Sequence, residues 1–192
     1  MNNLKKEKAV SSIHFRMMTF IMSIVKNIRD IKSEILNSGV KEGDFVLDYG
    51  CGPGYTTIIA SKIAGPNGMV YALDIHPLSI KIIEKKIKKN SLENVKTMLA
   101  GTRKLEDECI DVVLLFNVIF MVNNKKKIID ELYRILKKDG TISVVNSGLA
   151  SKFNKKQVSE ENLTQMFCGK NKFFLSQKIR NNYNFKKQFH PH

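Results

Sequence analysis

Three glycines stand at alternate positions in the segment 46–54, which reads V-L-D-Y-G-C-G-P-G. Because glycine has no side chain, Gly50 and Gly52 let a ligand lie close to the backbone, and Gly54 permits a tight entry into a following helix. The dinucleotide fingerprint G-x-G-x-x-G requires a glycine where this chain has Tyr55, and the G-K-[ST] of a phosphate-binding P-loop is absent. The pattern therefore favours a nucleotide-binding turn that does not hold a pyrophosphate.

Two acidic residues end neighbouring apolar runs. Asp48 closes the run before the glycines, and Asp74, twenty residues after Gly54, closes the run 71–74. A carboxylate at the end of the second strand is where nucleotide-binding folds accept hydrogen bonds from ribose hydroxyls. Asp48, at the end of the first strand, favours a cationic group on the ligand. Together the two acids predict a ribonucleoside that carries a positive charge.

The elements that must position these residues alternate between short apolar runs and amphipathic helices, a pattern typical of βαβ units and a parallel sheet. Apolar spacing predicts one long N-terminal helix that starts at Ser11 or Ser12 and runs through Ile35. The tail, 173–187, predicts an antiparallel hairpin that turns at Asn181-Asn182. Between them we predict strands over 45–47, 70–73, 95–99, 110–116 and 141–145, and helices ending near Ile63, starting near Leu78, and covering 128–136 before a turn at 138–140.

Composition and net charge limit the classes of partner that the sequence predicts. The 192 residues predict one domain, and 32 basic against 18 acidic residues give a net charge of +14. Lysine supplies 27 of the basic residues throughout the chain, so its runs at 85–89, 125–127 and 155–156 are interpreted as solvated faces. The sequence thus favours a small-molecule partner over nucleic acid.

Three cysteines without a CxxC pair predict neither a disulfide nor a metal site and fit the cytoplasm. The apolar run 17–25 is too short to span a bilayer, so we expect no membrane insertion. The sequence leaves the oligomeric state open.

From about Lys41 to Val145 the sequence resembles the class I S-adenosylmethionine-dependent methyltransferases, most closely the small ubiquinone-biosynthesis-like members. The resemblance rests on the glycine motif, the acid at position 74, the run 111–116 and the turn 136–140. It implies a Rossmann-like α/β fold with a doubly wound seven-stranded sheet in the order 3-2-1-4-5-7-6, in which strand 7 is antiparallel. It also implies an N-terminal helical cap or lid, 1–38, on one methyltransferase domain, 39–192.

The resemblance also implies which residues contact S-adenosylmethionine and the product S-adenosylhomocysteine. Gly50 and Gly52 would pass under the cofactor, in a loop shared with Cys51 and Gly54. Asp48 would order the loop and bind the methionine amino end, Asp74 would hold the ribose, and Ile75 would lie against the adenine. Thr102 replaces an acid that meets the adenine amino group in many members, and Asn117 is a further candidate contact.

The sequence does not identify a catalytic residue. Methyl transfer from a sulfonium depends largely on positioning, and a general base is needed only for a weakly acidic acceptor. Asn117 and His14 are the weak candidates, while Asn117 and Phe120 stand where related members carry an acid and a histidine. The expected enzyme is a methyltransferase with a small or lipophilic acceptor; an RNA or protein methyltransferase and a cofactor-binding protein without catalysis remain alternatives.

Overall fold

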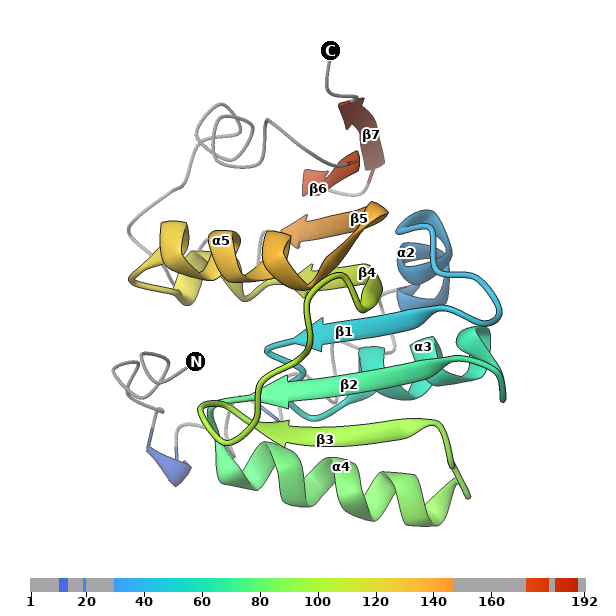
Figure 1. Ribbon diagram of the computed structural model, residues 1–192, viewed down its shortest axis with the longest axis vertical. Helices are drawn as coiled ribbons and strands as arrows, with labels where there is room; N and C mark the ends of the chain where they lie inside the picture. The colour runs from blue at the N-terminus through green and yellow to red at the C-terminus, as the bar shows by residue number, and fades with distance from the viewer. Residues whose placement is uncertain (1–10, 14–18, 20–29, 147–171, 180–181, 190–192) are drawn as a thin grey trace. The chain divides into compact units, whose positions relative to one another are not determined.

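The computed structural model describes residues 11–13, 19, 30–146, 172–179 and 182–189 (Figure 1). The chain divides into two units, residues 1–104 and 105–192. The single seven-stranded sheet and the division into 1–38 and 39–192 stay predictions.

The first unit contains a three-stranded parallel sheet in the order β3-β2-β1, built from β1 (Phe45–Tyr49), β2 (Met69–Asp74) and β3 (Val95–Leu99). The arrowheads of the three strands point to the same side in Figure 1, so their carboxyl ends lie at one edge. Two helices, α3 (Tyr55–Ala64) and α4 (Pro77–Lys89), make the crossovers that parallel neighbours require. The strands predicted in this region are confirmed, and β1 and β2 extend far enough to include Asp48 and Asp74.

The predicted long N-terminal helix is wrong at Asp30, which lies outside any helix and caps a new one, α2 (Ile31–Asn37). The Asp30 carboxylate accepts a hydrogen bond from the Ser33 N–H at 3.0 Å, and the Ser33 hydroxyl donates to its second oxygen. Aspartate competes in this way with the helical backbone and is favoured at helix starts. The apolar spacing continues through Asp30, so periodicity alone could not reveal the break.

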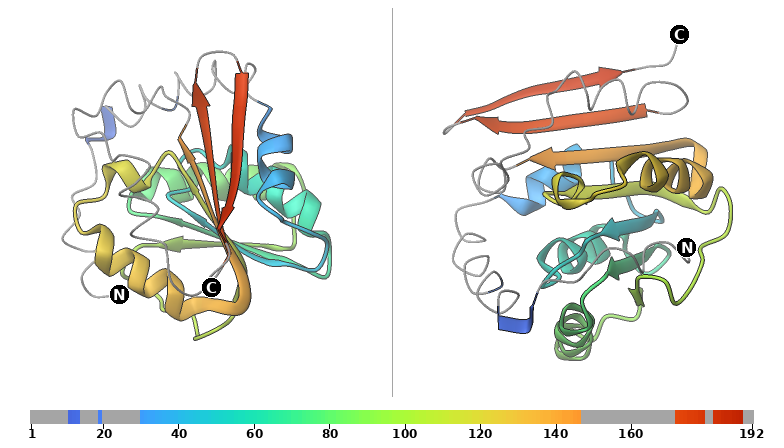
Figure 2. Two further views of the ribbon diagram at one scale, coloured as in Figure 1. Left: turned by 90° about the horizontal axis from the view of Figure 1, so that it is seen from above. Right: turned by 90° about the vertical axis from the view of Figure 1, so that its left-hand side faces the viewer.

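The second unit contains β4 (Ile110–Phe116), a short 3-10 helix (Ile119–Met121), α5 (Lys125–Ile135), β5 (Leu136–Asn146), β6 (Lys172–Ile179) and β7 (Asn182–Phe189). Here β5 pairs in parallel with β4 and with β6, and β7 pairs antiparallel with β6. Figure 2 shows the two long arms of β6 and β7 beside β5.

The order of the last strands corrects the prediction of 5-7-6, because the first arm of the hairpin, β6, is the neighbour of β5. A parallel neighbour needs a crossover of a dozen residues or more. The 25 positions between Asn146 and Lys172 are long enough for one. A hairpin pattern in the sequence predicts that two strands pair with each other. It does not predict which of the two strands pairs with β5.

The predicted turn at 138–140 is part of β5. Ile110 pairs with Leu136 and Val112 pairs with Thr141, so four residues of β5 stand opposite Asp111 alone. The Lys137 ammonium donates to both carboxylate oxygens of Asp111 at 2.8 Å, which holds this irregularity in place. The Lys-Asp-Gly signal therefore marks a bulge in a strand, a place where extra residues bend the backbone.

The apolar core of each unit lies where its helices cover its strands. In the first unit, Val46, Val70, Ala72 and Ile83 are fully buried, and in the second unit Leu114, Leu115 and Leu132 are buried. Within the described ranges no helix is both long enough and apolar enough to cross a membrane. The cytoplasmic location stays a prediction.

Candidate functional site

The glycine loop, residues 50–54, joins β1 to α3 at the carboxyl edge of the first sheet. Its three glycines all adopt positive φ, +73° at Gly50, +51° at Gly52 and +78° at Gly54, a region that other residues avoid. The N–H groups of Gly50 and Cys51 donate to the Leu73 carbonyl at 2.8 and 3.0 Å, which ties the loop to β2. The sequence prediction that glycine is needed at these alternate positions is consistent with this backbone.

Two of the glycines meet different surroundings. A Cβ atom added at Gly54 would lie 2.6 Å from Cγ1 of Ile83, so Gly54 is required for the packing of α4 against the start of α3. Among the described residues, a Cβ added at Gly52 would meet nothing closer than the Gly50 oxygen at 4.0 Å. The space beside Gly52 is therefore open, which is the property that the sequence predicts for a backbone surface under a ligand.

Asp74, at the end of β2, is bound to the loop by its carboxylate. Its Oδ2 accepts from the Gly52 N–H at 2.8 Å, and its Oδ1 accepts from the His76 N–H at 2.8 Å. His76 is itself buried, and its Nδ1 accepts from the Leu78 N–H at 3.1 Å as the cap of α4. His76 is therefore a buried capping residue at the start of α4.

Asp48, at the end of β1, is buried, and none of the described cationic side chains contributes to its pKa. Its Oδ2 accepts from the Thr57 hydroxyl at 2.6 Å. The pKa of Asp48 is raised from 3.8 to about 7, mainly because burial disfavours the charged form; the hydrogen bonds with Thr57 lower this pKa, and the nearby charge of Asp74 raises it. Among the described residues, no lysine or arginine contributes to this pKa. A buried carboxylate in this state favours a ligand that brings its own positive charge.

Two side chains of α4 also reach the loop, and neither contact is predicted by the sequence analysis. The Ser79 hydroxyl donates to the Gly52 carbonyl, and the Lys86 ammonium donates to the Pro53 carbonyl at 2.6 Å. The same ammonium lies 3.7 Å from the centre of the Tyr55 ring, at a distance typical of a cation–π contact. The half-buried Lys86 corrects the interpretation of the whole run 85–89 as a solvated face. The hydrogen bonds of Ser79 and Lys86 to the loop join residues 27 and 33 positions apart in the sequence, so no local pattern predicts them.

The remaining candidates of the first unit lie near the same sheet edge. Ile75 is 38% exposed. Thr102 is exposed, but its hydroxyl donates to the Leu99 carbonyl at 2.6 Å. Cys51 is buried, and burial raises the pKa of its thiol well above the ordinary value, so it is not poised to form a thiolate.

Asn117 belongs to the second unit, directly after β4. It adopts a positive φ of +59°, and its N–H donates to the Val145 carbonyl at 2.8 Å. Asparagine tolerates this conformation better than most residues do. His14 and the side chain of Phe120 lie outside the described part of the chain, so their proposed roles stay predictions.

The residues of the first unit fit a positively charged ribonucleoside. Asp48 and Asp74 provide two buried carboxylates, the first of them unpaired with any described cation, and Gly52 leaves open space at the backbone. The donor set suits a sulfonium or an ammonium and offers little to an anionic pyrophosphate.

Comparison with known proteins agrees with this arrangement. Residues 40–188 match the family described as "Methyltransferase domain". The arsenite methyltransferase of Halobacterium salinarum is 32% identical over 104 residues, 53% of this chain and 27% of the relative. The demethylmenaquinone methyltransferase of Lactobacillus johnsonii is 32% identical over 111 residues, 56% of this chain and 46% of the relative.

A solved structure shows the same relationship. The crystal structure of a SAM-dependent methyltransferase from Aquifex aeolicus superposes with a TM-score of 0.57 at 28% identity, covering 60% of this chain and 62% of that one. The chain spans between about a quarter and a half of the length of the two curated relatives. The family match covers most of the chain, which thus belongs to the class I S-adenosylmethionine-dependent methyltransferases.

Proposed function

We propose that this chain is an enzyme that transfers the methyl group of S-adenosylmethionine to a small, lipophilic acceptor and releases S-adenosylhomocysteine. The observation that carries the proposal is the buried Asp48 carboxylate, which has no described cationic partner and lies beside a loop with open space at Gly52. Membership of the family supports the same cofactor.

Bound S-adenosylmethionine would supply an activated methyl group on a sulfonium. In the proposal, Asp48 binds the cationic methionine end, and Gly50, Cys51 and Gly52 offer a backbone surface without bulky side chains. Asp74 holds the ribose, while its bonds to the Gly52 and His76 amides keep the carboxylate in a fixed orientation. Ile75 and Thr102 lie against the base, and Gly54 lets α3 begin directly after the loop.

Asn117 is proposed as a contact near the transferred methyl group. Its positive φ at the end of β4 is a conformation that proteins retain when surrounding structure enforces it, often at functional positions. A carbon or hydroxyl acceptor must also lose a proton, for which His14 is the remaining candidate base.

The relatives suggest two kinds of acceptor, a demethylated quinone and arsenite. Arsenic(III) is a soft centre that thiolates bind best. Burial raises the pKa of both described thiols, Cys51 and Cys109, so neither is poised as a thiolate. We therefore favour the quinol class, in which the acceptor is lipophilic and aromatic.

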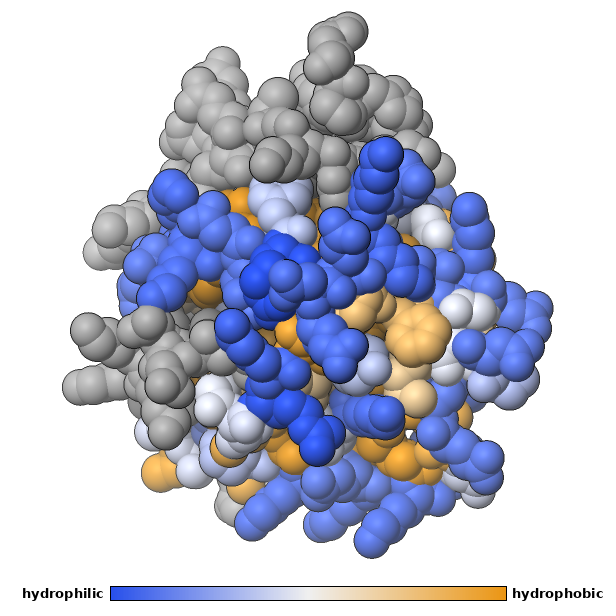
Figure 3. Space-filling view, in the orientation of Figure 1, coloured by the Kyte–Doolittle hydropathy of each residue, from blue (hydrophilic) through white to orange (hydrophobic). Residues whose placement is uncertain are grey.

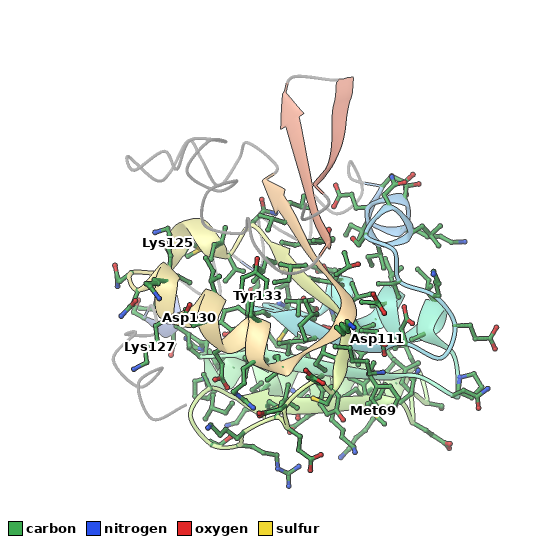
Figure 4. All side chains as sticks on the ribbon, turned by 45° about the horizontal axis from the view of Figure 1, so that its top comes forward. Met69, Asp111, Lys125, Lys127, Asp130 and Tyr133 are labelled. Carbon is green, nitrogen blue, oxygen red and sulfur yellow. The ribbon has the colours of Figure 1, made fainter. Side chains whose placement is uncertain are left out.

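An RNA or protein acceptor is the alternative suggested by the net charge. Figure 3 shows a largely hydrophilic face, and Figure 4 shows Lys125 and Lys127 projecting from α5. Lys126 is paired with Asp130 at 2.8 Å, and the Lys125 ammonium donates to the Val122 carbonyl at 2.7 Å. Part of this lysine run is thus satisfied within the protein, which favours the small-molecule acceptor.

Calorimetric titration of the purified protein tests the cofactor, with NADH as the control ligand. We expect S-adenosylmethionine and S-adenosylhomocysteine to bind at micromolar concentrations and NADH not to bind. Absence of binding by both adenosyl compounds would reject the proposal. A radiolabelled methyl-transfer screen then compares a demethylated quinol, arsenite and total RNA; binding without transfer to any of them would favour the catalytically inactive alternative.

We also propose that residues 1–38 act as a lid over the acceptor. Ile13, an apolar residue 80% exposed, supports the idea that this segment covers something apolar. Deleting residues 1–29, which leaves the Asp30 cap of α2 intact, should spare cofactor binding and impair turnover. Full turnover by the truncated protein would reject the lid.

A further inference from the structure

The glycine loop is held by side chains of α4. Gly50, Gly52 and Gly54 all have positive φ. Because glycine has no side chain, these three residues do little to hold the loop in one conformation. Ser79 and Lys86 donate to the carbonyls of Gly52 and Pro53, two consecutive residues. One helix, distant in sequence, therefore fixes the orientation of two successive peptide groups in the loop.

Lys86 differs from the other lysines of its helix. Four lysines form an exposed stripe along α4, and their ammonium groups make no hydrogen bond or ion pair with the described residues: Lys81, Lys85, Lys88 and Lys89. Lys86 is half-buried, and its ammonium lies between the Pro53 carbonyl, at 2.6 Å, and the face of the Tyr55 ring, at 3.7 Å from the ring centre. The two contacts join α4 to the last loop residues and to the first residue of α3.

We propose that Lys86 is a positioning residue for the cofactor, which acts by fastening the Pro53 side of the glycine loop to α4. Without this contact the loop would sample more conformations in the free protein, and binding would have to supply the ordering that Lys86 now provides in advance. The inference rests on the proposed function, since its ligand is the adenosyl cofactor. Lys86 would be a further residue that supports cofactor binding, and it lies outside the glycine loop and outside the strand ends that carry Asp48 and Asp74.

Three variants of the full chain test the role, Lys86→Met, Lys86→Arg and, as a matched control, Lys88→Met. Lys88→Met removes the same charge from the same helix at an exposed position without a described partner. Calorimetric titration with S-adenosylhomocysteine should show roughly tenfold weaker binding for Lys86→Met, as expected for one lost charge-assisted hydrogen bond. Lys88→Met should bind within twofold of the wild type, and Lys86→Arg should restore most of the affinity, because arginine keeps the charge and the donors.

A second measurement separates positioning from general stability. In the free protein, the carbonyl carbon of Pro53 and the amide of Gly54 should change their NMR chemical shifts in Lys86→Met and not in Lys88→Met. Equal affinity of Lys86→Met and Lys88→Met for S-adenosylhomocysteine would overturn the inference. So would weaker binding by Lys86→Met without a shift at Pro53 and Gly54, or without recovery in Lys86→Arg. A wild type that binds neither adenosyl compound would reject the proposed function itself, a result distinct from these.

Discussion

The buried Asp48 carboxylate makes the stability of the protein fall as the pH rises. In the unfolded chain Asp48 titrates near its ordinary pKa of 3.8, whereas burial holds the folded pKa at about 7. Between these values the unfolded chain has lost a proton that the folded protein keeps, so the free energy of unfolding decreases with pH. The interval from 3.8 to about 7, at 1.36 kcal/mol per unit, corresponds to roughly 4 kcal/mol.

The variant Asp48→Asn isolates this contribution, because its amide does not ionise and its oxygen can still accept from the Thr57 hydroxyl. Its stability relative to the wild type should be lowest below pH 4, rise steadily through pH 5 and 6, and level off above pH 7 after a total change of roughly 4 kcal/mol. Urea unfolding at each pH, without cofactor, measures the difference. All other titrating groups are common to both proteins, so they largely cancel.

The cofactor should reverse this effect. A cationic ligand lowers the pKa of Asp48, so binding to the wild type at pH 6 should release close to one proton, and binding to Asp48→Asn should be weaker and release none. Calorimetry in buffers of different ionisation enthalpy counts the protons. A stability difference that stays flat from pH 4 to pH 8 would refute the reasoning, because Asp48 would then be ionised in the folded protein at low pH and would need no cation.

Three further predictions follow from single contacts. Gly54→Ala should destabilise the protein by about 1–3 kcal/mol more than Gly52→Ala, because its Cβ overlaps Ile83, and equal urea midpoints would contradict this packing. Asp74→Ala should weaken S-adenosylhomocysteine binding about tenfold or more by calorimetry, since it leaves the Gly52 amide without its acceptor, and an unchanged affinity would remove Asp74 from the site. Arg134→Met should cost about 1–2 kcal/mol in urea unfolding, because Arg134 is hydrogen-bonded to Glu131, Asp107 and the Leu105 carbonyl, and a loss of less than about 0.5 kcal/mol would show that these exposed partners contribute little.

Buried strands could be predicted because their signal is local. β3 and β4 begin and end at the predicted residues, Val95–Leu99 and Ile110–Phe116, and the second of these is an apolar run broken only by Asp111. The positions of Asp48 and Asp74 at strand ends followed from the same runs. The turn from β1 into α3 could likewise be predicted, because glycines at alternate positions after an apolar run favour a backbone with positive φ.

Features that depend on a competing contact could not be predicted. The apolar pattern continues past Asp30, yet α2 begins directly after this residue, because the Asp30 carboxylate accepts a hydrogen bond from the Ser33 N–H. The segment 137–140 has the composition of a turn, yet the ion pair of Lys137 with Asp111 holds it within β5 as a bulge. In both cases the contacts of a polar side chain determine the local backbone structure, and hydrophobic periodicity does not predict such contacts.

The contacts of Lys86 also explain why the charge of Asp48 is left for a ligand. A lysine next to a glycine loop with two acids would ordinarily neutralise one of them. Here the Lys86 ammonium is engaged by the Pro53 carbonyl and the Tyr55 ring, and it does not contribute to the pKa of Asp48. In the proposed function, the same lysine fastens the loop and leaves the buried carboxylate unpaired among the described residues, so that a cationic cofactor would recover on binding the free energy that the burial of Asp48 costs. Lys86→Met should therefore weaken cofactor binding without changing the pH dependence of unfolding, whereas Asp48→Asn should change both.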